Sequence, residues 1–189
     1  HILGLEALGV EFKVEHGNIH ASVPHGVTGE TVSLAFASVG ATENLMMASV
    51  FAKGVTVIDN AAREPEIVDL ANMLNKMGAN IQGAGSPVIE IHGVTELHPV
   101  EHEVVGDRIE AGTFLAIGAL TGEPITVHGF ESNHLGLVLK KYEQMGITIE
   151  TGDRWARASR QQDLKAIDIQ TLPFPGFPTD MQAQTMTLL

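Results

Sequence analysis

The pattern of hydrophobic and polar positions repeats at an interval of about 70 residues, a spacing typical of stacked structural units. In each copy an apolar run predicts a helix that is hydrophobic nearly all round, Leu45–Ala52 in the first and Phe114–Leu120 in the second. A glycine then leads into an alternating strand, Val55–Ile58 or Ile125–His128. Because such helices have no polar face, we expect them to be buried nearly all round.

An amphipathic helix follows each strand, and its apolar stripe has the same spacing in both copies. The two stripes are Ile67, Leu70, Leu74 and Met77, and Leu135, Val138, Tyr142 and Met145. A glycine after each methionine ends the helix and leads into another strand, at 80–82 or 147–149. In the first copy this strand is expected to form a hairpin with Val88–Ile91 across Gly83–Pro87.

The two ends of the chain match parts of the same unit. Leu5, Leu8 and the strand Val10–Phe12 resemble the back half of an earlier unit, which a turn at Gly17-Asn18 joins to the strand Ile19–Val23. Met181–Leu189 resembles the first helix of a further unit. We therefore expect these residues to be part of a longer polypeptide.

The two helix types predict an α/β fold of repeated units that is built inside out. One helix of each unit is apolar and buried, the other is amphipathic and half exposed, and the sheet lies outside the buried helices. Several such units around a pseudo-threefold axis would place helices inside and sheets on the surface. The N-termini of the buried helices are then the polar points of the domain.

Composition and charge exclude several classes of structure and function. The longest apolar runs fall far short of the roughly 20 residues of a membrane span, and no signal peptide opens the sequence, so a cytoplasmic location is expected. The absence of cysteine excludes disulfides, thiolate metal sites and a cysteine nucleophile in these residues. A formal charge of −12 without a basic cluster argues against nucleic acid as a partner. An anionic ligand must therefore be attracted by local groups.

Three segments lead into the buried helices and supply such local groups: Ser38–Thr42, Asp107–Thr113 and Thr179–Ala183. Unpaired N–H groups and the positive end of the helix dipole favour anions there, and Gly40 allows a phosphate to approach the backbone closely. The alternative is that Ser38, Asp107 and Asp180 or Thr179 are ordinary N-caps. One such segment is weak evidence for a site, and three at the same point of the repeat are stronger evidence.

The proline-rich segment Pro173–Pro178 delivers a carboxylate to the third helix. Its three prolines restrict φ and are expected to hold the backbone extended until Thr179 and Asp180, where helical pattern begins. A carboxylate positioned in this way suits a catalytic acid or base.

A polar loop, Asn60–Glu66, runs into the first amphipathic helix. Arg63 and Glu64 are candidates to line a ligand cleft; the alternative is a capping loop in which Arg63 pairs with a nearby carboxylate. The histidine pairs with an interval of four straddle a Gly-Asn turn or enclose a proline, so no metal site is indicated. The run Gly83–Gly85 lacks the Lys-Ser/Thr of a nucleotide-binding P-loop.

Four motifs together resemble the UDP-N-acetylglucosamine 1-carboxyvinyltransferases, the enolpyruvyl transferases that begin peptidoglycan precursor synthesis. They are Ser38–Thr42, Asn60–Glu66, Asp107–Thr113 and Phe177–Gln184, in order over essentially the whole chain. The resemblance implies an inside-out α/β barrel in two domains that close over a cleft. There enolpyruvyl passes from phosphoenolpyruvate to the sugar 3′-hydroxyl and phosphate leaves, with no metal and no cofactor.

The resemblance also assigns roles to residues. It implies that Asp180 takes the 3′-hydroxyl proton and that Ser38, Val39 and Gly40 hold the UDP-sugar diphosphate. Further candidates to line the cleft are Arg63, Glu64, Arg108 and Thr179. Residues 1–105 would be the latter part of the first domain and residues 106–189 the early part of the second. The lid loop with its cysteine or aspartate would precede His1, and further cleft arginines would follow Leu189. Phe36 stands where the family often carries a cation, which removes one expected phosphate contact.

Two alternatives remain open at this point. The related shikimate-pathway enolpyruvyl transferase shares the repeats, but its phosphate site needs more basic, serine-rich helix starts than Ser38-Val39-Gly40. A non-catalytic sugar-nucleotide-binding protein on the same fold would keep the binding residues without turnover. Oligomeric state is not indicated by the sequence.

Overall fold

The computed structural model describes residues 1–189 and divides them into two compact units, His1–Glu103 and Val104–Leu189. The division lies close to the expected boundary at 105/106. The assignment of these units as the latter and early parts of two domains stays a prediction. Every helix of the structure is too short or too polar to span a bilayer.

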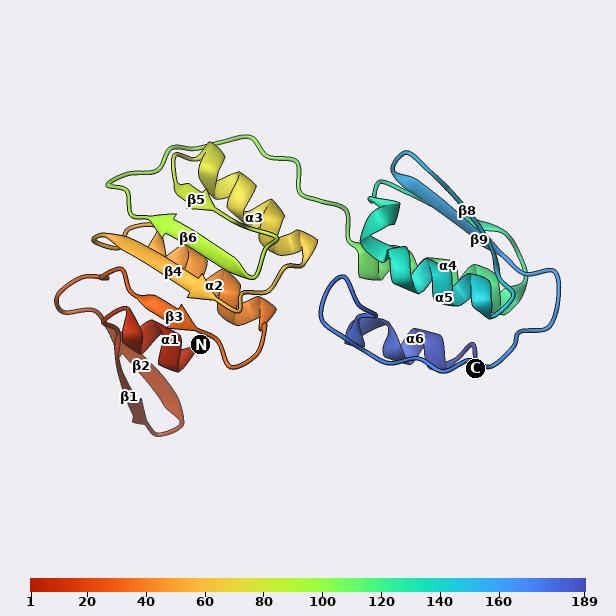
Figure 1. Ribbon diagram of the computed structural model, residues 1–189, viewed down its shortest axis with the longest axis horizontal. Coiled ribbons are helices and arrows are strands. Elements are labelled where there is room, and N and C mark those ends of the chain that lie inside the picture. Colours follow the sequence, from red (N-terminus) through yellow and green to blue (C-terminus); the bar gives the residue numbers. More distant parts are fainter. The chain divides into compact units, whose positions relative to one another are not determined.

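The first unit contains a four-stranded sheet, a separate hairpin and three helices (Figure 1). In order along the chain these are α1 (Ile2–Ala7), β1 (Glu11–Glu15), β2 (Asn18–Ser22), β3 (Thr31–Ser33), α2 (Val39–Ser49), β4 (Val55–Asp59), α3 (Pro65–Lys76), β5 (Asn80–Gln82) and β6 (Val88–His92). The sheet order is β3-β4-β6-β5, with β3 parallel to β4 and the other pairs antiparallel.

The core of the first unit lies between one face of this sheet and helices α2 and α3. Side chains along β4 and β6 alternate between buried and exposed, so that Ile58, Ile89 and Ile91 point into the core. They pack against Leu45 of α2 and Ile67 of α3, all fully buried. Each such side chain contributes about 1.5–3 kcal/mol of burial free energy. The expected order, helices inside and sheet outside, is confirmed.

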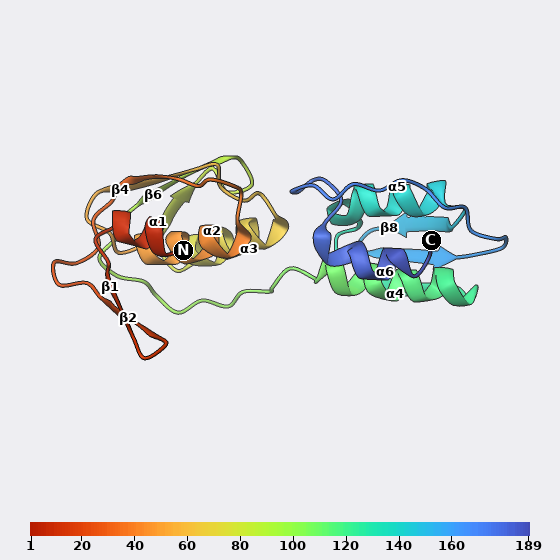
Figure 2. The same ribbon diagram turned by 90° about the horizontal axis from the view of Figure 1, so that it is seen from below.

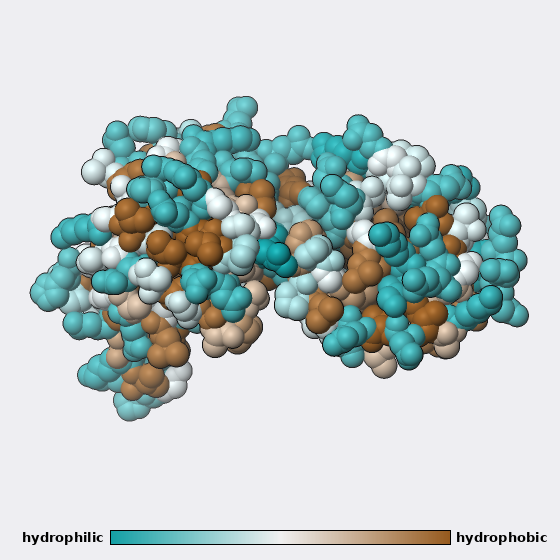
Figure 3. Space-filling view, in the orientation of Figure 1, coloured by the Kyte–Doolittle hydropathy of each residue, from teal (hydrophilic) through white to brown (hydrophobic).

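The hairpin β1–β2 forms a sheet of its own, and all of its residues are exposed except the half-buried Phe12 (Figure 3). Its turn consists of His16 and Gly17, which both have positive φ, and Asn18 already pairs with Glu15. The turn therefore lies one residue earlier than expected, and positive φ at both central positions is typical of a type I′ hairpin turn.

The second unit repeats the plan of the first. It contains α4 (Arg108–Thr121), β7 (Ile125–His128), η1 (Ser132–Leu135), α5 (Gly136–Gln144), β8 (Thr148–Gly152), β9 (Trp155–Ser159), η2 (Thr179–Met181) and α6 (Gln182–Met186). Its antiparallel sheet has the order β7-β9-β8. Helices α4 and α5 pack on the sheet, and η2 and α6 pack against α4 (Figures 1 and 2).

The predicted repeat is confirmed, since α2, β4, α3 and β5 correspond in order to α4, β7, α5 and β8. Two strands were not predicted, β3 and β9. The first has only three residues. The second buries Ala156 and Ala158, whose small side chains give a weak hydrophobic signal although both have no exposed surface.

Within residues 1–189, the apolar helices α2 and α4 are buried on only part of their circumference. Helix α4 exposes a stripe of apolar side chains, Phe114, Ile117 and Leu120, which are 45%, 41% and 50% exposed. Met47 on α2 and Phe51, just beyond the C-terminal end of α2, are likewise exposed. Burial all round needs packed elements on every side of a helix, and within these residues α2 and α4 have them on only part of their circumference.

Candidate functional site

The first cluster of candidate residues lies at the start of α2. Ser38 is the N-cap: its backbone is extended and its Oγ accepts a hydrogen bond from Ala41 N at 3.3 Å. Ser38 is therefore an N-cap in the structure, as the alternative interpretation states. Val39 and Gly40 form the first turn, where backbone N–H groups have no intrahelical acceptor and remain available to an anion.

The imidazole of His1 lies beside this first turn. A Cβ placed on Gly40 would be 3.2 Å from His1 Cε1, and His1 Nδ1 is 2.7 Å from Asn44 Nδ2. The close approach that glycine permits at position 40 is therefore made by this ring in the structure.

The loop that carries Arg63 and Glu64 is fixed beside the same helix start. The buried Thr42 hydroxyl donates to Ser38 O at 2.8 Å and accepts from Ala62 N at 3.0 Å. The Arg63 side chain is exposed, and its backbone N–H donates to Glu64 Oε2 at 2.9 Å. The structure thus brings the Ser38 turn and the Arg63 loop together.

Two carboxylates make the surroundings of this cluster acidic. The pKa of Glu43 is raised, first because the side chain is partly buried and second because the charge of Glu66 opposes ionisation. Phe36 is 72% exposed near the helix start, where a cation would have offset this charge. An anionic ligand here depends on the backbone N–H groups and on Arg63.

The second cluster lies at the start of α4. Asp107 is the N-cap, and its Oδ1 accepts from Ile109 N at 2.8 Å and Glu110 N at 3.0 Å. The next residue, Arg108, is 5% exposed, and its Cζ lies 5.6 Å from the centre of the Phe174 ring. Arg108 was expected to line the cleft by its side chain; here it holds Phe174 by a cation–π contact.

The proline-rich segment is not extended as expected. Its residues 173–176 form a turn, closed by a hydrogen bond of 2.8 Å from Gly176 N to Pro173 O. A second bond of 2.9 Å joins Leu172 N to Phe177 O. Proline restricts φ without fixing ψ, so a proline-rich segment is equally compatible with a turn.

Asp180 follows this turn in η2, and its carboxylate is exposed without a hydrogen-bond or ion-pair partner. Thr179 is exposed as well, and neither residue is an N-cap, because Pro178 holds that position. The next residue, Met181, is fully buried against Gly112 of α4, where an added Cβ would lie 2.8 Å from Met181 Cε. The packing of Met181 fixes the backbone next to Asp180, and the Asp180 carboxylate is free to accept a proton.

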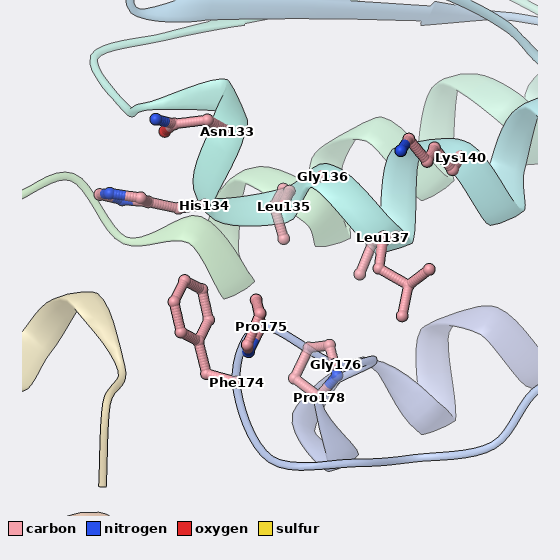
Figure 4. A pocket seen from close by; sticks show the side chains of 11 residues that line it. Asn133, His134, Leu135, Gly136, Leu137, Lys140, Phe174, Pro175, Gly176 and Pro178 are labelled. Carbon is pink, nitrogen blue, oxygen red and sulfur yellow. The ribbon is translucent and has the colours of Figure 1, made fainter. Parts of the chain in front are cut away.

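A pocket of about 300 Å³ lies between η1, the start of α5 and the turn at Phe174–Pro178. Phe174 and Pro175 face Leu135 and Leu137 across it (Figure 4). Asp180 and Thr179 do not line this pocket. The candidate catalytic carboxylate is therefore on a different part of the surface.

Comparisons with known proteins identify the family. A profile of the EPSP synthase (3-phosphoshikimate 1-carboxyvinyltransferase) family matches residues 1–189. The chain is 52% identical over 189 residues to a UDP-N-acetylglucosamine 1-carboxyvinyltransferase of Staphylococcus aureus and 55% identical over 188 residues to one of Symbiobacterium thermophilum. It spans 45% and 43% of their lengths, while they cover 100% of this chain.

Solved structures show the same fold. An enolpyruvyl transferase of Streptomyces tendae superposes with a TM-score of 0.86 at 21% identity, over 97% of this chain and 47% of its own. An EPSP synthase of Acinetobacter baumannii gives 0.65 at 21% identity, over 88% of this chain and 40% of its own. The chain belongs to the EPSP synthase family and has the inside-out α/β fold of enolpyruvyl transferases.

The motifs found in the sequence contain Thr42, Gly112, Thr113 and Gln184, but the sequence did not reveal that these residues hold the clusters in place. They do so by hydrogen bonds or by packing against neighbouring segments. A threonine in an apolar helix was a weak signal, because its hydroxyl commonly donates to its own helix.

Proposed function

We propose that the protein containing this chain transfers the enolpyruvyl group of phosphoenolpyruvate to the 3′-hydroxyl of UDP-N-acetylglucosamine. The observation that carries the proposal is the free, exposed carboxylate of Asp180, held in the motif Pro178-Thr179-Asp180-Met181-Gln182. Relatives at 52% and 55% identity bear the name of this activity and support the choice of acceptor.

In this reaction the sugar oxygen forms a bond to C2 of phosphoenolpyruvate while C3 takes up a proton, and the hydroxyl loses its own proton. C3 then gives up a proton as the bond between C2 and the phosphate oxygen breaks, which restores the double bond and releases phosphate. Asp180 accepts the hydroxyl proton as the new bond forms, because a free carboxylate at hydrogen-bond distance is a suitable general base. The atoms and charges of reactants and products balance without a metal or an oxidant.

The remaining candidates bind the substrates. The first turn of α2 at Ser38, Val39 and Gly40 receives the diphosphate through its N–H groups and the helix dipole. Arg63 adds a positive charge beside that turn, since the Thr42 hydroxyl fixes its loop there. Glu64, Thr179 and Arg108 border the two clusters, with Arg108 acting through the Phe174 ring.

The test is Asp180→Asn in a polypeptide of the relatives' full length that contains residues 1–189. Phosphate release with both substrates present should fall at least about a hundredfold, because asparagine has no basic oxygen. The Kd for the UDP-sugar should stay within about threefold. Asp153→Asn, at the exposed turn between β8 and β9, is the matched control. Turnover of Asp180→Asn close to wild type would contradict the assignment.

The family profile bears the name of the shikimate enzyme, which keeps 3-phosphoshikimate as the second candidate acceptor. Phosphate release should depend on UDP-N-acetylglucosamine and should not occur with 3-phosphoshikimate. The reverse preference would favour the shikimate reaction, and binding of the sugar nucleotide without release would favour a binding protein.

A further inference from the structure

The position of Asp180 depends on a helix that cannot be stable alone. Helix α6 has five residues and follows the short turn η2. Isolated helices shorter than about 12–15 residues are marginal in water. Contacts with α4 must therefore fix this segment, and with it the carboxylate.

A side-chain hydrogen bond makes one of these contacts. Gln184 Nε2 donates to Thr113 Oγ1 at 2.9 Å, from α6 to α4 and across 71 positions of sequence. The Thr113 hydroxyl in turn donates to Ile109 O at 2.8 Å, in the first turn of α4. Because that hydroxyl proton is engaged, Thr113 presents a lone pair to α6, and the amide of Gln184 must turn its NH₂ group toward it.

We propose that Thr113 and Gln184 are positioning residues that set the location of the Asp180 carboxylate by anchoring α6 to the first turns of α4. The proposal rests on the proposed function of Asp180. Gln184 lies one helical turn after Asp180, and the fully buried Met181 between them packs against Gly112, the neighbour of Thr113. The segment is thus held by an apolar contact and a directional polar one.

Stability alone does not explain a glutamine at this position. Its Oε1 is buried without a hydrogen-bond partner, and such an acceptor costs about 1–3 kcal/mol. A leucine would avoid this cost while filling a similar volume. What the amide adds is direction, because a hydrogen bond restricts the rotation and sliding of α6 that an apolar contact permits.

The first unit contains a similar anchoring threonine. Thr42 of α2 also donates its hydroxyl to the carbonyl four residues earlier and accepts a bond from a distant segment, the N–H of Ala62. There the anchored segment carries Arg63. In both units a threonine in the apolar helix holds a loop with a candidate functional residue.

The test uses Thr113→Val, Gln184→Leu and the double variant in a polypeptide of the relatives' full length. Misplacement by about 1 Å can cost up to about a hundredfold in rate, so each single variant should lower kcat about tenfold or more. The KM for the UDP-sugar should change less than about threefold, since its proposed diphosphate site lies at α2. The double variant should be no slower than the singles within about twofold, because both remove one bond.

Two controls separate positioning from general damage to α4. Thr113→Ser keeps the hydroxyl and should restore most of kcat. Thr121→Val removes an equivalent bond, from Thr121 Oγ1 to Ile117 O at 3.0 Å, at the far end of the same helix and should leave kcat unchanged. An unchanged kcat in Thr113→Val, even with a lower melting temperature, would overturn the proposal.

Hydrogen exchange supplies a readout that does not depend on activity. Thr113→Val should accelerate exchange of the amides in residues 182–188, and Thr121→Val should not. Full turnover by Asp180→Asn together with this acceleration would refute the catalytic role while the anchor stands. Unchanged exchange in Thr113→Val would refute the anchor whatever the role of Asp180.

Discussion

At the scale of single residues, one local pattern leads to different outcomes. A polar side chain stands before an apolar run at Ser38, Asp107 and Asp180. In the structure Ser38 and Asp107 use their side-chain oxygens as N-caps, whereas Asp180 lies one position inside η2 with its carboxylate free. A base must keep its lone pairs unoccupied, so the residue that does not cap is the one suited to proton transfer.

Phe36 gives a prediction at this scale. Phe36→Lys would place a positive charge near the proposed diphosphate site, where Glu43 and Glu66 now make the field negative. The Kd for the UDP-sugar should fall about fivefold at low salt, equivalent to about 1 kcal/mol, measured by calorimetric titration. The gain should shrink as salt is raised, because exposed charges are screened.

Phe51→Lys is the matched control for that change. Phe51 is 54% exposed beyond the other end of α2, so the variant adds the same net charge away from the helix start. Equal tightening by both variants would show a general charge effect. No tightening by Phe36→Lys would contradict the placement of the diphosphate.

At the scale of elements, the contact between α2 and α3 places two carboxylates close together. The pKa of Glu43 is raised because partial burial and the charge of Glu66 both favour its protonated form when folded. A raised folded-state pKa stabilises the protein below the ordinary carboxyl pKa, and this contribution is lost as pH rises through the raised value. At neutral pH the ionised Glu43 therefore opposes folding.

Glu43→Gln should remove this pH dependence. The thermal midpoint of the unit should rise slightly at pH 7 relative to wild type, and its decline between about pH 4.5 and 7 should become smaller. Because the side chain is only partly buried, the gain should be a few tenths of a kcal/mol. Glu11→Gln, on the exposed strand β1, should change neither quantity. A lower midpoint in Glu43→Gln at pH 7 would contradict this reading of the contact.

Helices and strands with a strong local sequence pattern were predicted correctly, and those with a weak pattern were not. The stripe of α3, its proline at the first turn and the glycine after it led to a helix found at Pro65–Lys76. Strand β9 was missed because its core positions are alanines. Proline content does not determine ψ, so the sequence does not distinguish the turn at 173–176 from an extended backbone.

At the scale of the whole molecule, apolar side chains on α2, just beyond its C-terminal end and on α4 remain exposed within residues 1–189. They are Met47, Phe51, Phe114, Ile117 and Leu120. Contiguous exposed apolar surface of this kind marks a packing face or favours association. The relatives are more than twice as long as this chain, so their further residues are available to cover such faces.

Residues 1–189 produced alone should therefore be poorly stable. We expect a broad thermal transition, self-association in sedimentation and binding of a hydrophobic dye. Replacing Phe114, Ile117 and Leu120 together by glutamine should reduce both dye binding and association. A cooperative, reversible transition of the monomer would contradict the expectation.

The sequence by itself determined the repeat, the order of helices and strands, the sheet outside the helices and the four motifs, because these depend on local periodicity and on residue types at fixed spacing. Only the tertiary structure decided which polar side chains cap and which stay free, and that Thr42 and Thr113 hold the Arg63 loop and the Asp180 helix. The two threonine anchors depend on partners 20 and 71 positions away. Hydrogen bonds and packing at such separations leave no trace in the local pattern of hydrophobic and polar residues.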